Sequence, residues 1–192
     1  PRTLFPYTTL FRSQYSVGVW REWAKDLDDG CAYRNCGTLW LAANAEEMHG
    51  AAQKMATLQT HGIDCKLLGA DTLQDAEPAL RKGLVGALKV TGDSIIYAPN
   101  AARWLLNRHA SRITRLDATV IEVDGNRVRL SDRRWLSANA VILANGIHAT
   151  ELCPELPIRP KKGHLLITDR YPVQIHHQLV ELDRKSTRLN SS

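Results

Sequence analysis

Residues 138–144, with the sequence ANAVILA, constrain the fold of this chain more than any other segment. The segment is mostly apolar and does not alternate between apolar and polar residues. A strand that is buried on both faces has this pattern, and such strands are typical of parallel sheets covered by helices. Asn145-Gly146 follows directly and favours a tight turn. The sequence therefore predicts a buried strand that stops at the carboxyl edge of a sheet, where open α/β sheets bind their ligands.

The turn after this strand has small side chains. Ala144 and Gly146 would let a phosphate or an extended polyol chain come into van der Waals contact with the backbone. A tight strand-to-helix turn that binds nothing explains the same residues, and the local pattern leaves both interpretations open. His148 is the histidine best placed to act near such a site, and a surface position on a helix is its alternative.

Several catalytic and nucleotide-binding motifs do not occur in the sequence. It has no G-x-G-x-x-G, no Walker A motif, no H-E-x-x-H and no G-x-S-x-G. The chain therefore does not show a complete phosphate-binding turn for a dinucleotide. The adjacent His176 and His177 would point to opposite faces of a strand, which makes a shared metal site unfavourable. No metal is expected.

Short helical and strand patterns fill the rest of the interior. Helices are expected at residues 17–28, 44–61, 71–77 and 98–110, and strands at 36–42, 63–68, 84–90, 118–123, 127–130, 158–168 and 173–181. Because several strands follow one another with few helices between them, a mostly antiparallel sheet is expected there. The fold class is therefore α/β with mixed, α+β character.

Local signals define some of these boundaries. Asn44, followed by Glu47, predicts a capped helix start, and Asp71 is expected to cap the short helix that ends at Glu77-Pro78. Asp124-Gly125-Asn126 predicts a hairpin whose second strand has one solvated face.

The net charge of +5 comes from 25 basic and 20 acidic residues. Residues 1–13 and 184–192 carry five of the basic residues and none of the acidic ones, so the interior has no net charge. A nucleic-acid partner is therefore not expected. Both ends lack a helical or strand period and resemble translated adapter sequence, with native disordered termini as the alternative. Both are set apart here as non-native tails.

The cysteines and the hydropathy suggest a compartment. The sequence has four cysteines and no C-x-x-C pair among them: Cys31, Cys36, Cys65 and Cys153. Because a domain of this size does not need disulfides, reduced thiols are expected. No run of 18 apolar residues could span a membrane, and no stretch has the order of a secretion signal. A cytoplasmic location is therefore expected.

The order of motifs resembles one family. The run VILANGIHATELCPELPIRPKKGHLLIT is similar to a segment of the glycine/D-amino-acid oxidase family of FAD enzymes, in which an apolar strand ending in a small residue and glycine precedes a P-x-[KR]-G strand. Upstream, YRNCGTLWLA, AEPAL, a D-x-x-I-Y-x-P segment and the ribbon ATVIEVDGNRVRL follow the family's order. Asn145 and His148 depart from its pattern, which has a small residue and an aromatic residue there. The resemblance covers residues 14–183.

The resemblance implies the central part of a two-domain flavoenzyme, with a partial FAD-binding Rossmann-like domain and a substrate domain that has a mixed, mostly antiparallel sheet. FAD is the implied cofactor. Val120, Ala144, Asn145 and Gly146 are its implied contacts, and Val120 corresponds to a valine at the adenine half. The implied reaction oxidises an amine or amino acid, of the glycine, D-amino-acid or hydroxyproline class, by hydride transfer to flavin.

The resemblance does not extend to the whole enzyme. The family's N-terminal glycine-rich turn and its C-terminal part are missing, so no catalytic residue is assigned and the isolated chain is expected to be inactive. A non-catalytic module of similar architecture that binds a small molecule or a partner is the alternative. The oligomeric state does not follow from the sequence.

Overall fold

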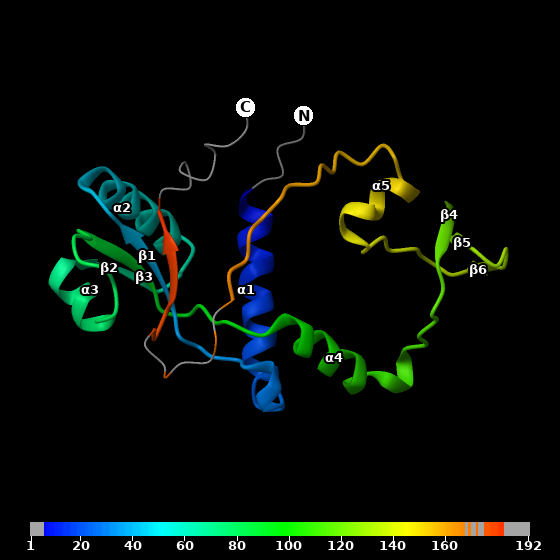
Figure 1. The fold of residues 1–192 in the computed structure, drawn as a ribbon, viewed down its shortest axis with the longest axis horizontal. Coiled ribbons are helices and arrows are strands. Elements are labelled where there is room, and N and C mark those ends of the chain that lie inside the picture. The colour runs from blue at the N-terminus through cyan, green and yellow to red at the C-terminus, as the bar shows by residue number, and fades with distance from the viewer. Residues whose placement is uncertain (1–5, 168, 170–171, 173–174, 183–192) are drawn as a thin grey trace. The chain divides into compact units, whose positions relative to one another are not determined.

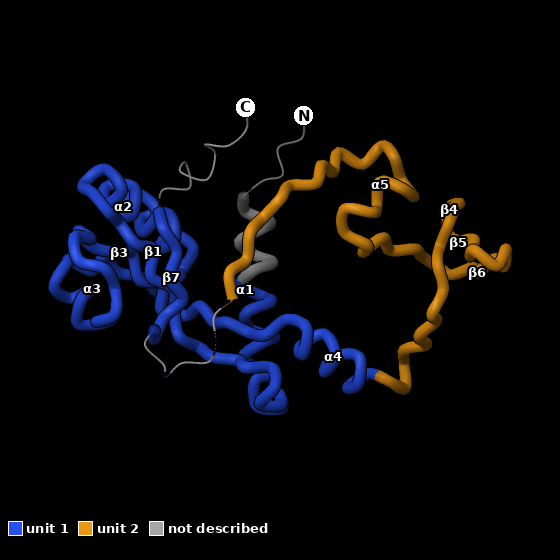
Figure 2. Tube along the Cα trace, viewed as in Figure 1, with its two compact units in different colours: residues 1–109, 170–192 blue, residues 110–169 orange. Residues whose placement is uncertain are grey.

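The computed structural model describes residues 6–167, 169, 172 and 175–182 of the chain. The chain divides into two compact units (Figure 2). Residues 110–169 make up unit 2, and the described residues on either side of that range make up unit 1. Within the described ranges, every helix is too short or too polar to cross a membrane.

Unit 1 is built on a four-stranded sheet in the order β2-β3-β1-β7 (Figure 1). β3 (Gly86–Val90) pairs antiparallel with β2 (Cys65–Gly69) on one side and with β1 (Thr38–Ala42) on the other. β7 (Gln178–Glu181) pairs parallel with β1. The mixed, mostly antiparallel sheet that the sequence predicts is therefore confirmed.

α2 (Ala45–Gln59) covers one face of this sheet and begins as the sequence predicts. The Asn44 side chain accepts a hydrogen bond from the Glu47 amide at 2.9 Å, and the Glu47 carboxylate accepts one from the backbone amide before Asn44 at 2.7 Å. This variant of a capping box satisfies the Glu47 amide, which the first turn of the helix leaves free, and the Ala43 amide just before the cap. Further along, Ala51 packs against Leu88 of β3 in a buried cluster.

α3 (Ala70–Ala76) packs on the sheet through a second cluster, in which Leu73 lies against Leu39 of β1. Burying a leucine side chain fully contributes roughly 1.5–3 kcal/mol, so this layer stabilises the sheet although the helix is short. The predicted cap at Asp71 is wrong. The helix begins directly after β2 with Gly69 at the cap position, which places Asp71 in the first turn.

α1 (Pro6–Trp23) starts well before the helix that the sequence predicts at residues 17–28, inside the segment set apart as a tail. It also ends earlier. The 3-10 helix η1 (Asp29–Cys31) follows, and the Asp28 side chain caps it by accepting a hydrogen bond from the Cys31 amide at 3.1 Å.

α4 (Ala98–Arg108) has Pro99 in its first turn, as predicted. The Trp104 ring of α4 lies 5.9 Å from the Trp23 ring of α1, measured between centroids. The Trp104 indole also donates a hydrogen bond to the Asp26 carbonyl at 3.2 Å. These contacts fix α4 against the end of α1.

Unit 2 contains a three-stranded antiparallel sheet in the order β4-β5-β6. β4 (Val120–Asp124) and β5 (Arg127–Leu130) are joined by a tight turn in which Gly125 has a φ of +59°. The hairpin predicted from the sequence is therefore confirmed. β6 (Trp135–Ser137) completes the sheet.

Three short helical segments make up the remaining regular structure described in unit 2. They are η2 (Ala110–Arg112), η3 (Gly146–His148) and α5 (Ala149–Leu152). η3 and α5 are consecutive, and α5 packs against β4.

Two predicted strands do not form. Residues 138–144 and 158–167 have no strand hydrogen bonding, and Ile142 and Leu166 are 86% and 90% exposed. A strand needs a neighbour that completes its backbone hydrogen bonds, and none of the described strands pairs with either segment. The strand predicted at 173–181 is shorter and begins at Gln178. Residues 168, 173 and 174 lie outside the described residues.

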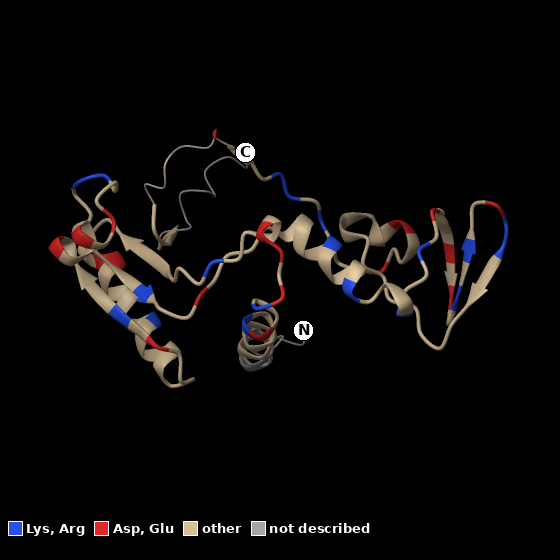
Figure 3. Cartoon of the chain, turned by 90° about the horizontal axis from the view of Figure 1, so that it is seen from below, with Lys and Arg blue, Asp and Glu red and all other residues tan. Residues whose placement is uncertain are grey.

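Basic and acidic residues are interspersed along the elements of both units (Figure 3). This distribution agrees with the balanced charge of the interior of the sequence.

Candidate cofactor-binding site

The three-stranded ribbon of unit 2 has one charged and one apolar face. Arg129 on β5 lies opposite Glu122 on β4 and Trp135 on β6. The preceding residue, Val128, lies opposite Leu136 of β6. Successive side chains of a strand point to opposite faces, so the charged and the apolar residues separate. The solvated face that the sequence predicts is thus present.

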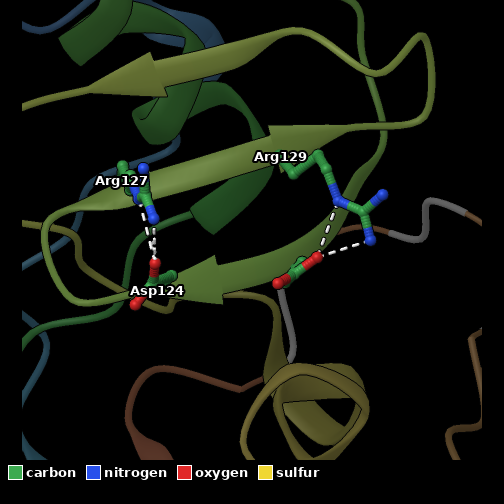
Figure 4. Close-up of polar contacts among 4 residues, drawn as sticks. Asp124, Arg127 and Arg129 are labelled. Carbon is green, nitrogen blue, oxygen red and sulfur yellow. Dashed lines mark hydrogen bonds and ion pairs between the residues drawn. The ribbon is translucent and has the colours of Figure 1, made fainter.

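Ion pairs hold the arginines of the charged face (Figure 4). The Nε of Arg129 donates a hydrogen bond to the Glu122 carboxylate at 2.6 Å, and the Nε of Arg127 donates one to the Asp124 carboxylate at 2.9 Å. The Arg127 guanidinium also lies 4.6 Å from the centroid of the Trp135 ring. Because both arginines are bound to carboxylates of their own ribbon, this face is not arranged to receive a phosphate group.

The apolar face carries Val120, the residue implied to contact the adenine half of FAD. Val120 begins β4 opposite Leu130, which is only 2% exposed. A β-bulge lies between Val120 and Glu122. Val120 itself is half-buried, so its side chain combines packing with an accessible apolar surface.

The predicted ligand turn lies elsewhere in unit 2, just before η3. Ala144, Asn145 and Gly146 are all exposed. Gly146 has a φ of +63°, and a Cβ added there would meet nothing within 4 Å. Glycine is favoured in this left-handed conformation, which explains the residue type at the turn.

The fold brings the elements that carry these residues together. Gly146 opens η3, which continues without a break into α5, and α5 packs against the strand that begins with Val120. Ala149, the first residue of α5, is 4% exposed. The turn and the ribbon therefore belong to one small packed unit, although the sequence separates them by more than 20 residues.

These residues fit one side of a site for an extended nucleotide cofactor. The turn offers bare backbone with open space beside it, and Val120 offers an apolar surface for a ring. A helix as short as η3 provides no terminal phosphate site of its own. On this side the turn is open to solvent.

The surroundings of His148 do not indicate a catalytic role. Its Nδ1 lies 2.7 Å from the Glu151 carboxylate, and the two side chains are 65% and 70% exposed. This arrangement agrees with the alternative interpretation of His148 as a surface residue of a helix.

The structure shows a pocket in unit 1 that the sequence analysis missed. It encloses about 350 Å³, within the size range of pockets for small ligands. Leu41, Leu80 and Leu84 give it apolar walls. Its charged side chains are one basic residue, Arg81, and two acidic residues, Glu47 and Glu181. These residues come from distant parts of the sequence, so no local motif marks them.

The described residues contain no group of three or more histidine, cysteine and acidic side chains that could hold a metal ion. His177 instead forms a hydrogen bond through Nδ1 with the carboxylate of Glu77 at 2.7 Å. Its ring is 12% exposed and the Glu77 side chain is fully buried.

All four cysteines are free. Burial raises the pKa of the Cys31 and Cys65 thiols above the ordinary value. At Cys153, the hydrogen bond to the Glu155 carboxylate, 2.8 Å long, is the main cause of a raised pKa. The thiols of Cys31, Cys65 and Cys153 are therefore not activated as nucleophiles, because a reactive cysteine needs a lowered pKa.

Known proteins resemble this chain in sequence and in fold. The profile of the family described as FAD dependent oxidoreductase matches residues 9–188. A D-amino acid dehydrogenase of Neisseria gonorrhoeae (strain NCCP11945) is 27% identical over 169 residues, which cover 80% of this chain and 40% of that protein.

Two solved structures share the fold. Glycine oxidase from Geobacillus kaustophilus has a TM-score of 0.67 at 22% identity, with coverage of 80% of this chain and 44% of that one. Glycine oxidase from Bacillus cereus ATCC 14579 has a TM-score of 0.66 at 21% identity, with coverage of 79% and 44%. The chain thus spans less than half of the length of these relatives. The α/β fold class expected from the sequence agrees with this likeness.

The family match includes the ribbon, the turn at Gly146 and most of unit 1. FAD is the cofactor of this family, as the resemblance of the motifs implied. The chain belongs to the FAD dependent oxidoreductase family.

Proposed function

We propose that this chain is the central part of an enzyme that oxidises an amine or amino acid of the glycine, D-amino-acid or hydroxyproline class. The observation that carries the proposal is the family match over residues 9–188, together with the similarity to a D-amino acid dehydrogenase and the fold of two glycine oxidases. When bound, FAD supplies the redox chemistry by accepting a hydride from the substrate.

Within this proposal, Val120, Ala144, Asn145 and Gly146 contact FAD. Val120 would pack against a ring of the cofactor, and the backbone at Ala144 and Gly146 would lie against its extended chain. The left-handed backbone at Gly146 and the open space beside it support this assignment. No catalytic residue is assigned, because the residues proposed to contact FAD at the turn carry no acid, base or nucleophile.

We also propose that the chain acts as part of a longer protein and is inactive alone. The exposed apolar residues of the two unpaired segments support this, because exposed apolar surface of this kind is usually covered by other protein. Leu165, Leu166 and Ile167 are 85%, 90% and 80% exposed. The native part is proposed to be residues 14–183, with residues 1–13 and 184–192 as foreign tails. We further propose a cytoplasmic location, which the free cysteines support.

The alternative is a non-catalytic module of this architecture that binds a small molecule. The pocket of unit 1 supports it, because apolar walls beside Arg81, Glu47 and Glu181 offer a small polar molecule both apolar and charged contacts. This pocket also suits the amino-acid substrate of an enzyme, so it does not separate the two functions by itself. A nucleic-acid partner is not proposed, because charges of both signs are interspersed.

The test uses the longer protein with the native sequence on both sides of residues 14–183. The purified protein is expected to show a flavin absorption spectrum. Glycine, sarcosine, D-amino acids and hydroxyproline are then added one at a time without oxygen, and one of them is expected to bleach the spectrum. If the protein stays colourless after FAD is supplied, that result would contradict the proposed oxidoreductase function and favour the non-catalytic binding module.

A further inference from the structure

A buried carboxylate in unit 1 has no role in the proposed cofactor site. Glu77 follows α3 and is 0% exposed. Its Oε1 accepts hydrogen bonds from the backbone amides of His176 at 2.7 Å and His177 at 2.6 Å. The Nδ1 of His177 lies 2.7 Å from the same oxygen. Residues about 100 positions apart in the sequence therefore meet at one carboxylate oxygen.

Lys89 extends this arrangement on the other side of the imidazole. The Nζ of Lys89 lies 3.0 Å from the Nε2 of His177. An ammonium group can only donate hydrogen bonds, so Nε2 has to accept, and the proton of the neutral ring has to be on Nδ1. The three side chains thus form a hydrogen-bonded row. The Glu77 carboxylate is its negative end, the Lys89 ammonium group is its positive end, and the His177 imidazole lies between them.

The position of this cluster matters for the strand that follows it. Gln178, the residue after His177, begins β7. β7 has only four residues and pairs with β1 on one side in parallel orientation. Parallel pairing is slightly weaker per residue than antiparallel pairing. A slip of one residue would also exchange the faces of Leu179 and Val180, so a short strand of this kind needs a further contact to hold its register.

We propose that Glu77, His177 and Lys89 form an anchor that sets the register of β7 on β1. The anchor holds two consecutive amides directly before the strand, in the part of unit 1 that follows unit 2 in the sequence. The Glu77 Oε2 has no hydrogen-bond partner among the described residues. A network that leaves a buried oxygen without a partner is not optimised for stability, and fixing one register is the best-attested role of buried charged groups.

Two amides report whether β7 is in place. The amide of Gln178 donates to the Gly37 carbonyl and the amide of Leu182 donates to the Leu41 carbonyl, both at 3.0 Å. In the 192-residue chain, Glu77→Ala is expected to speed hydrogen exchange at both amides by at least about tenfold, because bonds to a charged group are lost.

Two other amides report on the rest of the sheet. Val85 donates to the Ala42 carbonyl at 3.0 Å and Thr91 donates to the Asp64 carbonyl at 3.2 Å. Their exchange is expected to change less than about twofold in the same variant, since local opening leaves the remaining sheet intact. Equal acceleration at all four amides would mean that Glu77 only supports overall stability, and the anchor would then be wrong.

Matched variants distinguish loss of the anchor from a general effect of removing a charged side chain. Glu181→Gln removes an exposed carboxylate on β7 itself, and Lys66→Met removes the exposed lysine that lies directly opposite Lys89 on β2. Both variants are expected to leave the Gln178 and Leu182 amides protected from hydrogen exchange. Lys89→Met is expected to speed exchange at these two amides. If Lys89→Met left the exchange of both amides unchanged, Lys89 would not be part of the anchor.

A measurement on the unaltered chain decides the case if Glu77→Ala does not fold. The nitrogen chemical shifts of the His177 ring are expected to show a neutral imidazole with its proton on Nδ1. A proton on Nε2 instead would contradict the proposed order of donors and acceptors and overturn the anchor.

Discussion

Gly86 on β3 lies so close to β2 that a Cβ added to it would overlap the carbonyl oxygen of Leu68. The same Cβ would lie 3.0 Å from the sulfur of Met48 on α2. Gly86→Ala is therefore expected to lower the free energy of unfolding by about 1–3 kcal/mol, because backbone and helix have to move apart. Denaturant unfolding of the chain measures this loss.

Gly50→Ala is the matched control. Gly50 lies inside α2, and a Cβ added there meets nothing within 4 Å. Alanine is a better helix former than glycine, so this variant is expected to be more stable by up to about 1 kcal/mol. Equal destabilisation by both substitutions would show that the close approach at Gly86 is not the cause.

Gly146→Val tests the proposed cofactor contact in the longer protein. A valine there would place side-chain atoms in the open space beside the turn, and the affinity for FAD is expected to fall by about tenfold or more. Titration with FAD, followed by flavin fluorescence, measures the change. The strain of a side chain in the left-handed region adds roughly 1–2 kcal/mol to the cost of folding.

Gly125→Val controls for that strain. Gly125 has a φ of +59°, close to the +63° of Gly146, and also has open space at its Cβ position. It lies in the hairpin turn rather than at the predicted ligand turn, so this variant is expected to keep its FAD. Equal loss of FAD in both variants would argue against a direct contact at Gly146.

The ion pair of Arg129 and Glu122 is expected to contribute little to stability. Their side chains are 38% and 43% exposed, so solvent screens the attraction. A double-mutant cycle with Arg129→Ala and Glu122→Ala should give a coupling energy of about 0.2–1 kcal/mol, which falls as salt is added. A coupling several times larger would mean that the ribbon is covered in solution.

The buried cysteines predict a response to alkaline pH. The pKa of Cys31 and of Cys65 is raised in the folded state, mainly by burial. Such a thiol stabilises the fold fully below its unfolded pKa, and this contribution is lost as the pH rises through the folded pKa. The free energy of unfolding is therefore expected to fall above about pH 8.5, the range in which free thiols ionise.

Thiol labelling followed by mass spectrometry checks the same pair. Cys31 is 0% and Cys65 is 6% exposed, so both are expected to react with iodoacetamide much more slowly than the partly exposed Cys36. Fast labelling of Cys31 under native conditions would contradict the packing described for η1.

Local interactions explain which parts of the fold the sequence predicts. The cap at Asn44 and Glu47, the proline in the first turn of α4 and the hairpin at Gly125 depend on residues only a few positions apart. Their hydrogen bonds form wherever the local backbone forms, so residue types and spacing are sufficient. The order of short motifs also predicts the family, which the match over residues 9–188 confirms.

Contacts between distant residues decide the rest. Residues 138–144 have the composition of a buried strand, yet a strand also requires a neighbour for its backbone hydrogen bonds, and composition does not supply one. The parallel pairing of β7 with β1 and the contact of Glu77 with His177 join segments far apart in the sequence. The sequence alone thus determined the helix start at Asn44, the hairpin turn and the family of this protein. Only the tertiary structure decided which strands pair and where the buried charges meet, because those interactions depend on how distant segments are brought together.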